Sequence, residues 1–480
     1  MDVVTGKAVE AGVIPAGTEV GAGSAEVSQG AANCAGIQRR STPDLQNLME
    51  LVVGKANMLK AYHKVVRNGG SAGIDEVSIK DIKDYIDKYW PGIKAQMLTG
   101  KYKPKPVRGV QIPKPNGGIR QLGIPTVMDR IIQQALYQIL SLYFDPKFSR
   151  NSYGFRPEKS AHQAILKAKE YQSEGKRWVV DLDLAKFFDE VNHDVLMKRV
   201  KAVIKDKAVL KLINRYLKAG IMQNGQLGKR EKGTPQGGNL SPLLANIILD
   251  DLDKELERRG HSFCRYADDC NIYIRSLRSG QRVMKSLTRF IEHELKLKVN
   301  QEKSAVARPW ERKFLGYSFT NNVKVRIRVA AESVKKFKEG LKAEFRKGRG
   351  RNLTKFIREN LNPKIRGWIV YFNKADVKTF AEELDGWVRS RLRNIIWKQW
   401  KKPWTRKLNL MKAGLAEIQA IQSAFNGRGA YWNSIASHMK LALPKKYFDE
   451  CGLFSMLDYT LVYQKSIFGT AVYGTVRTVV

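Results

Sequence analysis

The chain has 480 residues, of which 43% are hydrophobic, and 85 Lys and Arg against 46 Asp and Glu give a net charge of +39. This length predicts several domains with real hydrophobic cores. The charge implies a polyanionic partner and favours nucleic acid over a membrane surface, because no apolar run is long enough to span a bilayer.

The four cysteines form no CxxC pair. We therefore expect neither a zinc ribbon nor a disulfide framework, and we expect a reducing compartment, the bacterial cytoplasm. We also find no pattern of a signal peptide.

The start of the chain differs in composition from the rest. Residues 1–40 contain no Phe, Tyr or Trp and are rich in Gly, Ala, Val and Ser, which predicts a disordered leader that cannot bury enough surface to become ordered. Ser41-Thr42-Pro43-Asp44 then predicts the start of a helix. Apolar residues at helical spacing continue to Val65, and we expect a helical extension over residues 41–98.

From about residue 99 the pattern mixes strands and helices. Residues 107–113 and 119–124 predict a hairpin around the turn Pro115-Asn116-Gly117-Gly118. The other elements expected in this region are helices over residues 129–144 and 240–256, strands over residues 178–184, 295–299 and 313–319, and a second hairpin over residues 263–274.

After about residue 325 the chain is helical in pattern and strongly basic, and residues 321–410 hold 25 Lys and Arg against 8 Asp and Glu. Residues 411–480 predict a small mixed domain. The expected division is a leader (1–40), an N-terminal helical extension (41–98), a mixed region (99–322), a basic helical region (323–410) and a terminal domain (411–480).

The second hairpin carries adjacent carboxylates, Asp268 and Asp269, between two apolar arms. Such close charges repel each other, and burial disfavours their ionised form unless a cation is present. Hard cations such as Mg²⁺ prefer carboxylate oxygen, so this segment suggests metal-dependent chemistry. The plainer alternative is a polar hairpin turn, in which Asp is common.

Two-metal phosphoryl transfer needs about three converging carboxylates. Asp181 and Asp183 lie on the same face of the strand predicted at residues 178–184, and either could be the third. Asp189 lies beyond the end of this strand, where we expect it to cap the next helix.

Seven ordered blocks of the sequence resemble reverse transcriptases, specifically those encoded by group II introns. The central blocks are WVVDLDLAKFFDEVNH (178–193), GTPQGGNLSP (233–242) and YADD (266–269), and the others lie at residues 112–126, 152–157, 313–317 and 361–368. The resemblance covers roughly residues 45–480. It implies an α+β right-hand polymerase with fingers, an antiparallel-sheet palm, a helical thumb (323–410) and a small C-terminal domain that binds DNA or RNA.

The resemblance also implies roles for single residues. It selects Asp183 over Asp181, so Asp183, Asp268 and Asp269 are the expected catalytic ligands of two Mg²⁺ ions, with Mn²⁺ as a substitute. The carbonyl of Leu184 is a further expected ligand.

Five other residues are expected around the incoming nucleotide: Lys114 and Arg120 on the triphosphate, Phe188 beneath the sugar, where a 2′-hydroxyl would clash, and Gln236 and Gly237 near the base pair. The structural alternatives are a solvated basic hairpin for Lys114 and Arg120, an aromatic core position for Phe188, and a plain turn before a helix for Gln236 and Gly237.

Nucleic-acid contacts are expected from two regions. Tyr153, Phe155 and Arg156 combine aromatic and cationic groups suited to a template strand, and buried aromatics between fingers and palm are the alternative. In the basic region the expected contacts are Arg366, Trp368, Tyr371, Arg389, Arg391, Arg393, Trp397, Lys398, Lys401 and Lys402, although tryptophans at helical spacing, such as Trp368 and Trp387, are more often core.

The function implied is an RNA-directed DNA polymerase that copies intron RNA for retrohoming and, as a maturase, assists splicing. Its partners would be group II intron RNA, an RNA template with a DNA primer, a DNA target and dNTPs, with no membrane. Since Cys451 and His438 are the only cysteine and histidine after residue 410, we expect no metal-binding endonuclease domain, as in compact class C proteins. The alternatives are an RNA-binding maturase with a vestigial polymerase site and a host-adopted reverse transcriptase in repair or phage defence.

Overall fold

A computed structural model describes residues 47–113 and 117–463. They form two compact units. The described residues up to Leu315 form the first unit, and those from Gly316 onward form the second unit. The predicted leader, the predicted helix start at Ser41 and Lys114 lie outside the described residues.

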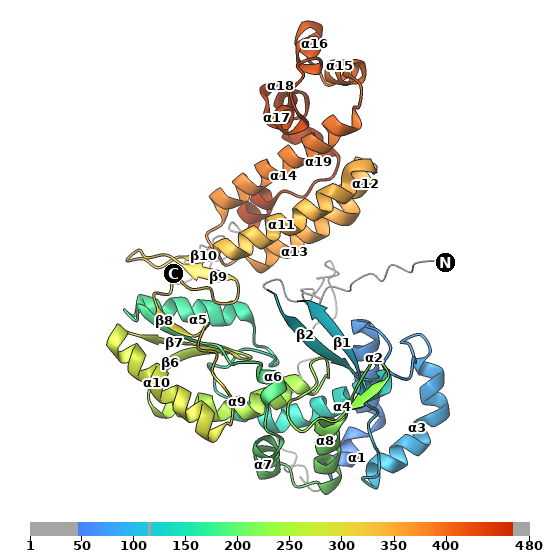
Figure 1. Cartoon of the computed structure of the whole chain (residues 1–480), viewed down its shortest axis with the longest axis vertical. Helices are drawn as coiled ribbons and strands as arrows, with labels where there is room; N and C mark the ends of the chain where they lie inside the picture. The colour runs from blue at the N-terminus through green and yellow to red at the C-terminus, as the bar shows by residue number, and fades with distance from the viewer. Residues whose placement is uncertain (1–46, 114–116, 464–480) are drawn as a thin grey trace, which may run out of the picture. The chain divides into compact units, whose positions relative to one another are not determined.

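The first unit holds the elements α1 to α10 and β1 to β8 (Figure 1). They are α1 (Leu48–Val52), α2 (Lys55–Asn68), α3 (Ile82–Leu98), β1 (Val107–Pro113), β2 (Ile119–Ile124), α4 (Val127–Phe144), α5 (Ala161–Ser173), β3 (Trp178–Leu182), α6 (Phe187–Glu190), α7 (His193–Val203), α8 (Lys207–Lys218), β4 (Ile221–Gln223), β5 (Gln226–Gly228), α9 (Ser241–Arg258), β6 (Ser262–Tyr266), β7 (Asp269–Ile274), α10 (Leu277–Glu294) and β8 (Ala305–Ala307).

Two four-stranded sheets organise the first unit. One has the order β2-β1-β4-β5, with a parallel pairing of β1 with β4, and the other is antiparallel in the order β6-β7-β3-β8. Figure 1 shows α5 and α10 on opposite sides of the antiparallel sheet. At Gly280 of α10 an added Cβ would lie 2.4 Å from the Ile274 side chain, so this helix packs very closely on the sheet.

One hydrophobic core runs through the first unit. It includes Leu48 of α1, Met97 of α3, Ile132 of α4 and Leu287 of α10. The N-terminal helices therefore share the core of the two-sheet region, and the backbone N–H of Met49 donates to the Asp206 carboxylate at 2.7 Å.

The second unit is helical apart from a two-stranded ribbon of β9 and β10. Its elements are β9 (Tyr317–Phe319), β10 (Ile327–Val329), α11 (Ala331–Lys347), α12 (Leu353–Phe356), α13 (Asn362–Tyr371), α14 (Lys378–Gln399), α15 (Pro403–Lys412), α16 (Glu417–Ala424), α17 (Ala430–Ile435), α18 (Ser437–Ala442) and α19 (Lys445–Glu450). Residues 411–463 contain no strand, so the mixed character predicted for this part is wrong over the described residues.

The predicted α+β class, the helical basic region and both hairpins are confirmed. The strand expected over residues 295–299 is wrong except for a bridge between Val299 and Leu184, because Lys296 has a left-handed φ of 55° that an extended strand cannot contain. The strand expected over residues 313–319 is shortened to β9 for the same reason, since Leu315 has a φ of 51°. None of the described helices has the length and apolar character needed to cross a membrane.

Candidate functional site

Carboxylates converge where β3 ends beside the turn between β6 and β7. Leu182 lies opposite Cys270 in the antiparallel pairing of β3 with β7, so Asp183 continues the strand next to Asp269. The Asp183 carbonyl accepts a hydrogen bond from the backbone N–H of Asn300 at 2.8 Å. This bond keeps the chain extended past the end of β3 and fixes the position of Asp183.

The alternation of the strand decides which face carries the charges. Val180 and Leu182 are buried in the core, so Asp181 and Asp183 occupy the opposite face. The apolar residues thus anchor the strand, and the carboxylates lie on its other side.

Neighbouring carboxylates make ionisation at this site unfavourable. Although Asp269 is exposed at the residue level, partial desolvation by the surrounding protein, followed by repulsion from Asp268, Asp181 and Asp183, raises the pKa of its carboxyl group to about 7. Burial and the charge of Asp183 also raise the pKa of Asp268. Such a cluster of oxygen donors fits a hard divalent cation, which would relieve the repulsion. In the part of the chain that the structure describes, no three His, Cys, Asp or Glu side chains are already close enough to hold a metal ion.

The geometry separates Asp181 from Asp183, which the strand pattern could not do. Arg312 binds one Asp181 carboxylate oxygen through Nη2 at 2.6 Å and Nε at 2.8 Å. Asp181 therefore has a structural partner, which favours Asp183 as the third ligand.

Arg265 is a residue that the sequence reasoning missed. It is fully buried on β6 and forms an ion pair with Asp253 of α9, with Nη2–Oδ2 and Nε–Oδ1 distances of 2.6 and 2.7 Å. Its Nη1 donates to the Asn246 side chain and to the Ala267 carbonyl, both at 2.9 Å. Ala267 has a φ of 57°, so this guanidinium holds a strained peptide directly before Asp268. An Arg inside the apolar arm FCRY was the available signal, because such a position requires a buried acidic partner.

The loop before α5 braces the same hairpin. The backbone N–H of Tyr153 donates to the Arg265 carbonyl at 2.8 Å, and that of Arg265 donates to the Asn151 carbonyl at 2.9 Å. At Gly154 an added Cβ would lie 2.3 Å from the Ala267 nitrogen. Only glycine allows this close approach, so the loop supports the turn between β6 and β7.

Two of the three residues expected on the template, Tyr153 and Arg156, have structural roles in this loop. Tyr153 is buried, and Arg156 uses its guanidinium on the Asp145 carboxylate at 2.7 Å and on the carbonyls of Ser149 and Ser152. Burial of Tyr153 and the hydrogen bonds of Arg156 give both side chains a structural role. Phe155 remains 40% exposed.

Of the residues expected around the nucleotide, Arg120 on β2 lies within electrostatic reach of Asp268 and opposes the upward shift of its pKa. Phe188 is half-buried and lies edge-on to the buried Phe187, with ring centroids 5.1 Å apart. Leu184 is buried and forms the bridge with Val299. The structure therefore brings Arg120 to the site from a different sheet.

The turn at Gln236 and Gly237 joins two other parts of the site. The Gln236 carbonyl accepts from the Gly123 N–H of β2 at 2.9 Å, and the Thr234 N–H donates to the Phe188 carbonyl at 2.7 Å. Gly237 has a φ of 125°, and an added Cβ would lie 2.8 Å from the Gly123 carbonyl. This turn therefore has to contain glycine to connect the hairpin of β1 and β2 with the segment of Phe188.

Asp189 does not cap the next helix, so that prediction is wrong. The cap of α7 is Asn192, whose side chain accepts from the N–H groups of Asp194 and Val195. Asp189 instead accepts from Gln236 Nε2 at 3.4 Å.

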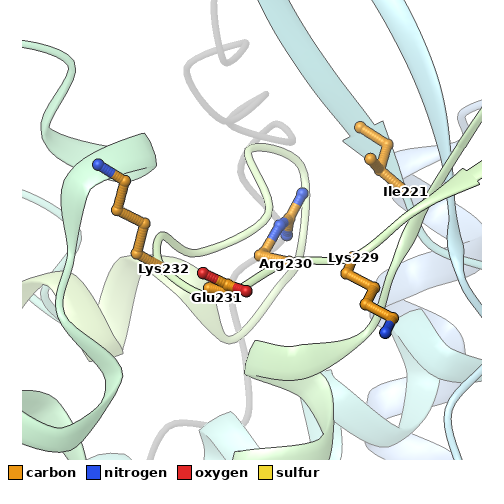
Figure 2. A pocket seen from close by; sticks show the side chains of 5 residues that line it. All are labelled: Ile221, Lys229, Arg230, Glu231 and Lys232. Atoms are coloured by element: carbon orange, nitrogen blue, oxygen red, sulfur yellow. The ribbon is translucent and has the colours of Figure 1, made fainter.

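A cavity of about 540 Å³ lies at the segment that leads into this turn, and Figure 2 shows its five lining side chains, Ile221, Lys229, Arg230, Glu231 and Lys232. Lys232 pairs with Glu190 at 2.7 Å, and Asp189 lies within electrostatic reach of Arg230. The local charges nearly cancel, so this cavity has no clear preference for an anion.

The basic residues predicted in the second unit divide into exposed and structural groups. Arg366, Lys398, Lys401 and Lys402 are exposed, and Arg389 and Arg391 are half-buried. Arg393 is buried and donates through Nε and Nη2 to the Leu443 carbonyl at 3.0 and 2.8 Å, which is a structural role.

Three tryptophans of the second unit pack against other residues, whereas Trp404 and Trp432 are exposed. Trp397 is buried, and Trp368 stacks on Phe337 with ring centroids 4.4 Å apart. Trp387 is half-buried and meets Phe345 edge-on. Tyr371 contacts Tyr317 through its ring at 5.7 Å and accepts a hydrogen bond from the Tyr317 hydroxyl at its carbonyl.

Comparisons with known proteins identify two families along the chain. Residues 112–319 match the family described as reverse transcriptase (RNA-dependent DNA polymerase), and residues 334–414 match the group II intron, maturase-specific domain. The two matches divide between the first unit and the second unit almost as the structure does.

Individual relatives share parts of the chain. Protein YkfC of Escherichia coli (strain K12) is 31% identical over 302 residues, which cover 55% of this chain and 79% of YkfC. The group II intron-encoded protein LtrA of Lactococcus lactis subsp. cremoris is 35% identical over 257 residues, covering 53% of this chain but only 41% of LtrA. A partial Cas6-RT-Cas1–Cas2 complex is 25% identical with a TM-score of 0.34, covering 52% of this chain and 43% of that chain.

Proposed function

Since this chain belongs to the group II intron-encoded proteins that join a reverse transcriptase to a maturase domain, we propose that it copies intron RNA into DNA at the site of Asp183, Asp268 and Asp269. The observation that carries this proposal is the convergence of these carboxylates at the end of β3 and the turn between β6 and β7, where desolvation and the charge of Asp183 raise the pKa of both Asp268 and Asp269.

The three carboxylates, with the carbonyl of Leu184, would hold two Mg²⁺ ions, with Mn²⁺ as a substitute. When bound, such ions activate the primer hydroxyl and stabilise the charge of the leaving pyrophosphate. Arg265 and the loop at Gly154 hold in place the turn that carries Asp268 and Asp269.

The residues around the carboxylates would select and orient the nucleotide. Arg120, with Lys114, would neutralise the triphosphate. Phe188 would form the wall beneath the sugar, where a 2′-hydroxyl clashes, so that deoxynucleotides are favoured. Gln236 and Gly237 would lie near the new base pair, because their turn connects to both the Phe188 segment and the hairpin of Arg120.

The second unit would bind intron RNA in its role as a maturase. The exposed cations Arg366, Lys398, Lys401 and Lys402 suit phosphate contacts. The domain bounds predicted from sequence, at residues 98, 322 and 410, remain proposals alongside the structural division at residue 315.

A primer-extension assay tests the proposed function. We expect the purified chain, given Mg²⁺, dNTPs and a DNA primer on an RNA template, to make full-length cDNA. A protein that binds the RNA but leaves the primer unextended would instead be a maturase with a vestigial polymerase site.

Metal binding has a consequence that does not depend on catalysis. The raised pKa of Asp269 means that its carboxylate is harder to ionise in the folded state, so the stability associated with its protonated form is lost as pH rises from its ordinary value of 3.8 through about 7. At pH 8 the metal-free cluster is therefore repulsive, and Mg²⁺ at about 100 times its Kd is expected to raise the Tm of the first unit by about 5 °C.

Thermal unfolding with and without Mg²⁺ measures this effect. Asp269→Asn removes one charge, so it is expected to unfold at or above the wild-type Tm without metal and to gain little from Mg²⁺. An equal Mg²⁺-dependent gain in the two proteins would show that the ion binds elsewhere.

A further inference from the structure

A second cavity, of about 660 Å³, lies in the first unit away from the carboxylates. It lies between α5 and the loop that precedes this helix. Ser152 of that loop pairs with Arg265 on β6, which is an edge strand of the antiparallel sheet. The cavity is therefore at the outer edge of the sheet, and none of Asp183, Asp268 and Asp269 lines it.

The charges of this cavity are mainly positive. Lys147, Arg150, Lys159 and Lys167 line it, and Glu257 is the acidic residue among its lining residues. Lys167 pairs with Glu170 at 2.6 Å. Among the described residues, no ion pair within 4 Å is found for the other three cations. Lys159 Nζ donates a hydrogen bond to the Arg150 carbonyl at 3.4 Å, which leaves its charge unneutralised. The three positive charges can therefore attract an anion from outside the protein.

The acidic residue is already engaged. Glu257 Oε1 accepts a hydrogen bond from the Ser149 hydroxyl at 2.6 Å. This bond turns one carboxylate oxygen toward the protein and reduces the repulsion that an entering anion would meet.

The inner wall of the cavity is aromatic and its lysines are oriented by the rings. Tyr153 and Tyr171 are each 7% exposed. Lys159 Nζ lies 5.3 Å from the Tyr153 ring centroid, and Lys167 Nζ lies 4.9 Å from that of Tyr171. Cation–π contacts of this kind restrain an ammonium group without neutralising its charge. Because ammonium groups already cover the rings, the cavity suits a phosphate better than a stacked base.

We propose that this cavity binds a backbone phosphate of a nucleic-acid strand, at a place separate from the carboxylate site. The nature of the strand rests on the proposed function, which supplies RNA as the natural ligand. The loop that forms the cavity also braces the turn between β6 and β7 through Asn151 and Tyr153. A strand held there therefore contacts the support of the active site without entering it.

A charge-matched pair of triple variants tests the proposal. Lys147→Gln, Arg150→Gln and Lys159→Gln together remove the unpaired cations of the cavity. Arg278→Gln, Arg282→Gln and Lys285→Gln remove three exposed cations of α10. Affinity for a fluorescent RNA oligonucleotide is measured against salt concentration, and thermal unfolding checks that both variants fold.

The cavity variant is expected to bind about 10-fold more weakly at moderate salt, with a slope of log Kd against log salt that is shallower by about 1, as for the loss of one phosphate contact. The α10 variant is expected to weaken RNA binding by less than about 3-fold at the same salt concentration. Equal losses in the two variants would reflect overall charge and would overturn the proposal.

A footprint on the wild-type protein gives a direct readout. RNA is expected to protect Lys147 and Lys159 from amine acylation, measured by mass spectrometry, and inorganic phosphate at the same phosphate concentration is expected not to. Protection by inorganic phosphate would identify a free-phosphate site and overturn the assignment to a strand, and no protection by RNA would overturn the site itself.

Primer extension with the same sample separates this proposal from the proposed function. If the primer is extended but the lysines are not protected, the proposed strand binding in the cavity is wrong and the polymerase function stands. If the lysines are protected but the primer is not extended, the polymerase function is wrong and the cavity proposal stands.

Discussion

Asp183→Asn is expected to lower the rate of primer extension on an RNA template by at least about 1000-fold. The amide keeps the size of the side chain but removes a negative charge and a strong oxygen donor from the proposed metal site, and metal-ion catalysis contributes several kcal/mol to such reactions. The measurement is the single-turnover rate with Mg²⁺, repeated with Mn²⁺ in case a softer ion restores part of the activity.

Asp181→Asn is the matched control, because Asp181 lies two residues away on the same face of β3. Its carboxylate is held by Arg312, so its replacement is expected to reduce the rate less than about 10-fold and to act mainly through stability. Equal losses in the two variants would contradict the assignment of Asp183 as a ligand and of Asp181 as its structural neighbour.

The strand pattern of the sequence cannot determine which of these two aspartates is the metal ligand. A strand has a period of two, so Asp181 and Asp183 are equivalent in any pattern argument. Arg312 separates them, and it is 131 residues away in the chain. The family resemblance selected Asp183 without giving this physical reason.

The fold was predictable where local chemistry and tertiary structure agree. The hairpin of β1 and β2 has turn glycines that the structure gives positive φ, Gly117 at 82° and Gly118 at 80°. The strand expected around Lys296 was wrong and the one expected over residues 313–319 was too long, because Lys296 and Leu315 take left-handed conformations. Nothing in a hydrophobic pattern reports such a residue, since its cost is met by tertiary contacts.

Short strands were missed for a related reason. β4, β5 and β8 have three residues each, too few for a period to be recognised. Pairing defines them instead: β4 pairs with β1, β5 pairs with β4, and β8 pairs with β3.

The support of the active site depends on a buried ion pair that joins distant segments. Arg265→Met leaves the Asp253 carboxylate buried without its partner, and we expect a loss of about 3–5 kcal/mol in the free energy of unfolding. Chemical denaturation followed by a probe in the first unit measures this loss. The double variant Arg265→Met, Asp253→Leu removes both charges and is expected to recover most of the stability, because well-packed apolar pairs often replace buried ion pairs at little cost.

The double variant separates stability from positioning. It still lacks the N–H that the Ala267 carbonyl accepts at 2.9 Å, and a left-handed alanine is disfavoured by about 1–2 kcal/mol unless its surroundings hold it. Asp268 follows Ala267 directly, so a relaxed turn would move the carboxylate. We therefore expect kcat to fall about 10- to 100-fold while the KM for dNTPs changes little, since a shift of about 1 Å in a reacting group costs this much.

Arg265→Lys sharpens the same test, because lysine keeps the charge but cannot reproduce the planar fork that reaches Asp253 and Ala267 together. It is expected to retain more stability than Arg265→Met and to remain as slow as the double variant. A double variant with wild-type kcat would show that Arg265 serves only the core, and the position of Asp268 would then have to depend on the loop at Gly154, whose approach to the Ala267 nitrogen leaves no room for a side chain.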